Sequence, residues 1–150
     1  AIALSRQKLP YINPKFSENN ECEKGAYTVR MDSHENKVTL VASGSEVELA
    51  INVHDELKKN NISSKVVSMP CQELFNKQSE DFKKNILDKE SLIVTIEAGN
   101  VSSWEKYLGN RGISIGIDKF GESAPYKQVY EHLNLSVEKI VLAIQERLRK

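Results

Sequence analysis

The chain has 150 residues, and its 21 lysine and arginine residues balance its 21 aspartate and glutamate residues, so that the formal net charge is zero. A dedicated nucleic-acid binder carries a basic stripe, which is absent here, so we expect no nucleic-acid partner. No apolar run approaches the roughly 18 residues that span a bilayer, and no signal-peptide pattern is present, so we expect no membrane partner either. The length fits one soluble domain.

Two cysteines, Cys22 and Cys71, lie far apart and form no Cys-x-x-Cys motif. This usage is typical of a reducing, intracellular setting, and we expect a cytoplasmic protein in which each thiol is a packing residue. The three histidines, at positions 34, 54 and 132, have none of the spacings of a metal site.

The first part of the chain predicts a loop followed by an edge strand. Residues 10–25, PYINPKFSENNECEKG, contain two prolines and many polar groups, as in a linker or surface loop. In the next stretch, AYTVRMD (26–32), apolar and polar residues alternate, which indicates a strand with one buried face. The connection to the following strand is short and polar, so we expect these two strands to pair antiparallel.

From residue 38 onward, apolar strands alternate with amphipathic helices. The predicted strands are VTLVA (38–42), SKVVSMP (64–70), SLIVTIEA (91–98) and ISIGID (113–118), the last nearer a sheet edge because its residues alternate. Helices are predicted at 46–60, through 78–87, near 103–108 and twice in the final part of the chain. This order predicts an α/β fold: a three-layer α/β/α sandwich around a mixed sheet of about five strands, four parallel and the first antiparallel at an edge.

Ligands of open parallel sheets bind where strand carboxyl ends meet helix amino ends, and three turns here have the right composition. In the first, residues 43–45, Gly44 permits a tight turn and Ser45 with Glu48 matches a Ser-x-x-Glu capping box. This helix start could also hold a phosphate or carboxylate, although Glu46 and Glu48 would repel an anion. We favour capping and keep a small-anion or nucleotide site near Ser43–Ser45 as the alternative.

The second turn places Glu97 at the end of a buried strand, where burial could raise its pKa and make it a general base. The third is GIDKFGESAP (116–125), in which Ser123 suits a helix N-cap and Pro125 the first helical position. Its polar and flexible residues are Asp118, Lys119, Gly121, Glu122 and Ser123. We favour a structural role over a catalytic one at both turns.

Five segments, taken together and in this order, indicate a protein family more specifically than any one of them does alone. They are ALSRQKLP, TLVASGSEVELA, VVSMPCQELFNKQ, IEAGNVSSWEKYLG and IGIDKFGESAP. The series resembles the carboxyl-terminal end of the transketolase family over nearly the whole chain. The loops at 13–25 and 58–64, rich in Asn and Lys, depart most from that pattern.

The resemblance implies a thiamine-diphosphate enzyme of the pentose phosphate pathway that moves a two-carbon ketol unit between sugar phosphates. In that family, thiamine diphosphate and a divalent metal, Mg²⁺ or Ca²⁺, lie between domains that these residues do not match. We therefore expect no cofactor or metal bound by this chain and no catalytic residues in it. The implied partners are the remaining transketolase domains, a second copy in a homodimer, and sugar phosphates.

The resemblance divides the chain into residues 1–20, the end of a preceding pyrimidine-binding domain with its linker, and residues 21–150, the C-terminal domain. Arg6, in Leu-Ser-Arg-Gln, matches the family arginine that binds the substrate's terminal phosphate. A guanidinium suits that task because its planar fork donates two parallel hydrogen bonds to phosphate. Without its own domain, we expect segment 1–8 to be extended, poorly ordered or held by a neighbouring molecule.

Overall fold

Five strands form one mixed sheet in the computed structural model, which describes residues 8–12, 20–32 and 35–149. The strands are β1 (Tyr27–Met31), β2 (Val38–Ala42), β3 (Ser64–Ser68), β4 (Leu92–Ile96) and β5 (Ile113–Ile115). Their order is β1-β3-β2-β4-β5, with β2 to β5 parallel and β1 antiparallel to β3. The predicted fold class is confirmed, including an antiparallel first strand at one edge and β5 at the other.

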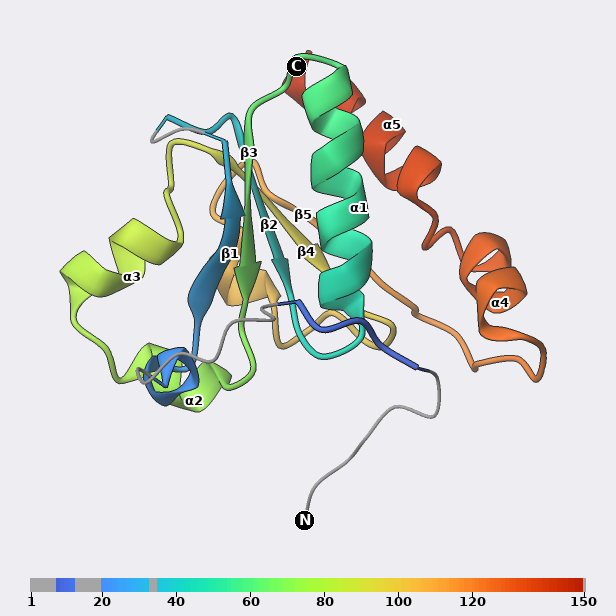
Figure 1. Ribbon diagram of the computed structural model, residues 1–150, viewed down its shortest axis with the longest axis horizontal. Coiled ribbons are helices and arrows are strands. Elements are labelled where there is room, and N and C mark those ends of the chain that lie inside the picture. Colours follow the sequence, from blue (N-terminus) through green and yellow to red (C-terminus); the bar gives the residue numbers. More distant parts are fainter. Residues whose placement is uncertain (1–7, 13–19, 33–34, 150) are drawn as a thin grey trace.

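Helices cover both faces of this sheet. They are η1 (Glu21–Lys24), α1 (Glu46–Lys59), α2 (Gln72–Asn76), α3 (Glu80–Ile86), η2 (Glu105–Tyr107), α4 (Tyr126–His132) and α5 (Val137–Leu148). Helices α1 and α5 lie on one side and α2 and α3 on the other (Figure 1). The helix predicted through 78–87 is confirmed as α3, which begins at Glu80 because Ser79 is extended and N-caps it by accepting a hydrogen bond from Phe82 N. The short helix α2 before it was not predicted.

The predicted hairpin between β1 and β2 does not form, because β2 has no free edge. It lies between β3 and β4 and pairs with both in parallel. The connection from β1 instead crosses the start of β3, where the Asp32 amide donates to Ser64 O and the Lys37 amide donates to Ser63 O. The short polar connection between β1 and β2 therefore passes over β3, and β1 pairs with β3 instead of β2.

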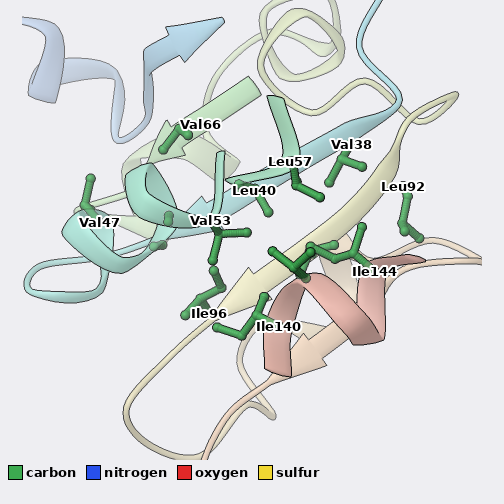
Figure 2. Packing of buried hydrophobic residues seen from close by; sticks show 14 of the residues in the cluster. Val38, Leu40, Val47, Val53, Leu57, Val66, Leu92, Ile96, Ile140 and Ile144 are labelled. Atoms are coloured by element: carbon green, nitrogen blue, oxygen red, sulfur yellow. The ribbon is translucent and has the colours of Figure 1, made fainter. Parts of the chain in front are cut away.

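The sheet separates two apolar clusters. The larger one joins alternate residues of β2, β3 and β4 to the inner faces of α1 and α5; Figure 2 shows Leu40, Val53 and Ile144 meeting there. The smaller one contains Val41, Phe75 and Trp104 and lies under α2, α3 and η2. Every residue of β2 and β4 is buried, as predicted for strands that are apolar on both faces.

A polar network at the amino end of the parallel strands fastens β1 to α1. His54 is only 4% exposed, and its Nδ1 shares a 2.8 Å hydrogen bond with the buried Ser64 hydroxyl. Asp32 follows β1 and accepts from the Ser64 amide at 3.2 Å, while its other oxygen lies 3.0 Å from Lys58 Nζ and 3.7 Å from His54 Nε2. The histidine on the apolar face of the helix is therefore a packed structural residue.

Asp32 should stabilise the fold at neutral pH. Partial burial raises its pKa, but the hydrogen bonds from Lys58 and the Ser64 amide, with the nearby His54 and Lys58 charges, outweigh this and hold the pKa below its ordinary value of 3.8. A carboxyl group with a lowered folded pKa stabilises above its unfolded pKa, and the effect is lost as pH falls through the folded value.

Asp32→Asn should therefore lower the free energy of unfolding by about 1 kcal/mol at pH 7, the usual scale of one hydrogen bond. Urea unfolding at pH 7 and near pH 3 measures this, and the difference from wild type should shrink at the lower pH. Asp55→Asn, at an exposed position of α1, is the control. An equal loss at both pH values would contradict the assignment.

Candidate functional site

Three sequence-predicted turns meet at the carboxyl end of the parallel strands. The β2–α1 turn, the β4–η2 loop and the segment from β5 to α4 all lie at that end (Figure 1). The described residues 8–12 also run across it, close to the start of α1. The parallel register of β2, β4 and β5 is the reason, because it brings Ala42, Ile96 and Ile115 to one level. This is the end at which ligands of open α/β sheets bind.

The turn at Ser43–Ser45 does not offer a full set of unbonded N–H groups to an anion. The Glu46 amide donates to Ser43 O at 3.2 Å and the Val47 amide to Gly44 O at 3.4 Å, so two of the first helical N–H groups are already occupied. The capping box predicted for Ser45 is also wrong: Ser45 has helical dihedral angles, and its side chain makes no cap hydrogen bond. No observation at this turn favours the small-anion or nucleotide alternative.

The Ser45 hydroxyl binds a buried carboxylate instead. It donates to Glu46 Oε1 at 2.7 Å, and Tyr130 of α4 donates to the same oxygen at 2.7 Å. Glu46 is 6% exposed. Burial, the hydrogen bond to Glu46 and the charge of Glu46 together raise the pKa of Tyr130 well above its ordinary value, so this phenol stays protonated and donates. The Tyr130–Glu46 bond ties α4 to the start of α1.

The Glu46–Tyr130 pair leaves no signal in the sequence, for a physical reason. Glu46 stands in the first turn of a helix, where an acidic side chain is ordinary because it interacts favourably with the helix dipole. Its partner lies 84 residues away in the chain. No periodicity or local motif links the two positions; only the return of α4 to the same end of the sheet does.

Glu97 takes the structural role that we favoured. Its Oε2 accepts a 3.2 Å hydrogen bond from Trp104 Nε1, which anchors the loop between β4 and η2. Burial raises the pKa of Glu97, the Trp104 bond partly opposes this, and the neighbouring Glu46 carboxylate raises it further. Glu46 and Glu97 thus form a crowded pair of acids, and none of the ion pairs among the described residues includes either of them.

In the turn GIDKFGESAP, Ser123 is not the helix cap. Pro125 takes the N-cap position of α4, and no side chain makes a capping bond there. The side chains of Asp118, Lys119 and Ser123 are exposed. Glu122 pairs with His132 at the end of α4 at 3.1 Å, which holds the segment to the helix that it introduces. These contacts are structural and place no nucleophile beside a base.

A cavity of about 530 Å³ opens between α1, α4 and the start of α5. Apolar side chains of Leu49, Leu135 and Val137 line it together with Tyr126 and Tyr130, whose rings meet edge to face at 5.9 Å. The carboxylates lining it are Glu48, Glu131 and Glu138, and its described lining contains no lysine or arginine. Such a lining suits an apolar group that carries a positive charge and is unfavourable for an anion.

Comparison with known proteins identifies the chain. Residues 25–136 match the profile of the family described as "Transketolase-like TK C-terminal domain". The chain belongs to the transketolase family. The chloroplastic transketolase of Spinacia oleracea is 43% identical over 145 residues, and the transketolase of Bacillus subtilis is 40% identical over 153 residues. These alignments cover 95% and 100% of this chain but only 19% and 23% of the relatives, so the chain spans about a fifth of their length.

Solved transketolases share the fold. A transketolase from Pichia stipitis matches 96% of this chain and 20% of its own, with a TM-score of 0.85 and 28% identity. The transketolase of Campylobacter jejuni matches 88% of this chain and 20% of its own, with a TM-score of 0.77 and 34% identity. The mixed sheet and its helical layers are therefore the transketolase C-terminal architecture.

A diphosphate needs cationic or free N–H donors. At the carboxyl end of the sheet the exposed Lys119 is such a donor, but the carboxylates of Glu46, Glu48 and Glu97 lie at the same end and are unfavourable for the diphosphate of thiamine diphosphate. In the part of the chain that the structure describes, no group of three or more His, Cys, Asp and Glu side chains could hold a metal, and no helix is long and apolar enough to cross a membrane. Arg6 lies outside the described residues, so its role stays a prediction.

Tyr130→Phe tests the bond that ties α4 to α1. The phenol donates to a carboxylate at a half-buried position, so its loss should lower the free energy of unfolding by about 1–2 kcal/mol at pH 7. Urea unfolding monitored by Trp104 fluorescence measures this loss. Tyr126→Phe removes a hydroxyl at a more exposed position of the same helix and should change stability by less than about 0.5 kcal/mol. Equal effects of the two variants would contradict the role of the Tyr130 hydroxyl.

Proposed function

We propose that this chain is the C-terminal domain of a longer transketolase. The full polypeptide would move a two-carbon ketol unit from a ketose phosphate to an aldose phosphate in the pentose phosphate pathway, with thiamine diphosphate and a divalent metal bound by its other domains. One observation carries this proposal: the C-terminal-domain profile matches residues 25–136, and relatives named as transketolases are 36–43% identical over nearly all of this chain. Residues 21–150 would be the domain, and residues 1–20 the end of the preceding one.

The role that we propose for this domain is structural support and assembly of the enzyme, which would work as a homodimer. The described residues support a scaffold because their polar groups bind one another: Glu46 holds Tyr130, Glu97 holds Trp104, and Asp32 holds the start of β3. Two free cysteines accord with the cytoplasmic location that we propose, although relatives include enzymes named as chloroplastic.

A ketol-transfer assay tests the function. With thiamine diphosphate, Mg²⁺, a ketose phosphate and an aldose phosphate, the longer polypeptide should transfer the two-carbon unit and the 150-residue chain should give no rate above the uncatalysed background. Addition of the 150-residue chain to the intact enzyme serves as a control for inhibition. Ketol transfer by the 150-residue chain alone would overturn the proposal that catalysis resides in the other domains.

We also propose that Arg6 binds the terminal phosphate of the substrate. Arg6 lies four residues before Pro10, in the segment assigned to the preceding domain, so it would act beside the catalytic centre rather than in this fold. A guanidinium–phosphate pair provides both charge and geometric selectivity, which explains how a single side chain could discriminate sugar phosphates from free sugars.

Arg6→Ala in the longer polypeptide should mainly raise KM for phosphorylated substrates. Loss of one charge-assisted interaction of about 1.5–3 kcal/mol corresponds to a fall of about 10- to 150-fold in kcat/KM. Steady-state kinetics with a phosphorylated and an unphosphorylated acceptor measure the difference, and Arg6→Lys should recover part of the loss. Equal losses with both acceptors would exclude phosphate recognition by Arg6.

A further inference from the structure

Two aromatic side chains at the carboxyl end of the sheet are almost wholly exposed. Tyr11 is 93% exposed and Phe120 is 98% exposed, while Leu9 and Tyr126 are each more than two-fifths exposed. Single exposed apolar residues are normal. Here, however, Leu9 and Tyr126 line the same cavity, Tyr11 follows Leu9 by two residues in the chain, and Phe120 stands in the segment that leads into Tyr126. We call these four residues the docking face.

Two hollows are lined in part by residues of the docking face. Phe120 lines a depression of about 470 Å³ together with Gly99, Asn100 and Ile117. The cavity lined by Leu9 and Tyr126 contains apolar side chains together with the carboxylates of Glu48, Glu131 and Glu138. An apolar patch beside concave surfaces is the usual form of a protein interface, with aromatic side chains as its anchors.

We propose that the docking face is the surface on which the rest of the longer polypeptide packs, burying Tyr11 and Phe120 and presenting a basic side chain to the cavity lined by Glu48, Glu131 and Glu138. This inference rests on the proposed function, because it requires the longer chain.

Two observations select this occupant. The relatives are about five times as long as the part that this chain matches, so four-fifths of such a polypeptide remains to cover surface. Residues 8–12, which we assign to the end of the preceding domain, run close to the start of α1, and Leu9 lines the cavity, so the preceding domain would meet this one at the docking face. The charge of the partner follows from complementarity, because three carboxylates line the cavity and its described lining contains no cation.

Other exposed apolar residues provide controls. Leu142 on α5 and Met31 at the end of β1 are each about half exposed and lie outside both hollows of the docking face. Glu146 on α5 is an exposed acid that does not line the cavity. If exposure alone determined the contacts, changes at these positions would act like changes at Phe120 and Glu131.

Hydrogen–deuterium exchange of the 150-residue chain and of the longer polypeptide tests the proposal. Amides of residues 116–126 should exchange at least about tenfold more slowly in the longer polypeptide than in the 150-residue chain. Phe120→Ser and Glu131→Gln should each remove much of that protection in the longer polypeptide and leave exchange in the 150-residue chain unchanged. Leu142→Ser and Glu146→Gln should leave the protection intact.

The outcomes separate the possible occupants. No added protection in the longer polypeptide, or loss of protection from Leu142→Ser but not from Phe120→Ser, would overturn the assignment of this face. Concentration-dependent self-association of the 150-residue chain that Phe120→Ser abolishes would assign it to a second copy instead. A longer polypeptide without ketol-transfer activity would reject the proposed function, but its exchange data would still test the docking face.

Discussion

Burial of strand β2 on both faces is the constraint on which the rest of the structure depends. A parallel strand without a free edge or an exposed face needs a neighbour on each side and helices above and below. Helices α1 and α5 provide one cover, and α2, α3 and η2 provide the other. The same parallel arrangement brings the loops that follow β2, β4 and β5 to one end of the sheet, which concentrates Glu46, Glu97 and Phe120 there.

The chemistry of that end differs from that of a phosphate-binding α/β domain. Its buried and half-buried acids, Glu46 and Glu97, accept hydrogen bonds from Ser45, Tyr130 and Trp104, and the amides of Glu46 and Val47 at the start of α1 are already bonded. These bonds fix loops and helices relative to one another. A surface that carries acids and exposed aromatic side chains is suited to contact with protein.

Patterns that report burial along one element were reliable predictors. LIVTI is buried on both faces, and the α5 stripe of Ile140, Val141 and Ile144 packs into the core as its spacing indicates. Contacts between elements that are distant in the chain could not be predicted from such local patterns. The partner of β1, the Tyr130–Glu46 bond and the failed caps at Ser45 and Ser123 depend on which surfaces meet after folding. Arg6 was assigned by resemblance alone, since nothing in its local pattern distinguishes it from a solvated loop cation.

The pairing of β1 with β3, rather than with the next strand in the chain, has a consequence for synthesis of the chain. Ribosomes release residues 27–31 before residues 64–68, at about 5–20 residues per second, so the strand made first has no partner when it emerges. It must wait until β2, α1 and β3 have been made, with its apolar face uncovered. Until β3 is available, the unpaired edge strand leaves the nascent domain open on that side, where chaperones or neighbouring chains can bind.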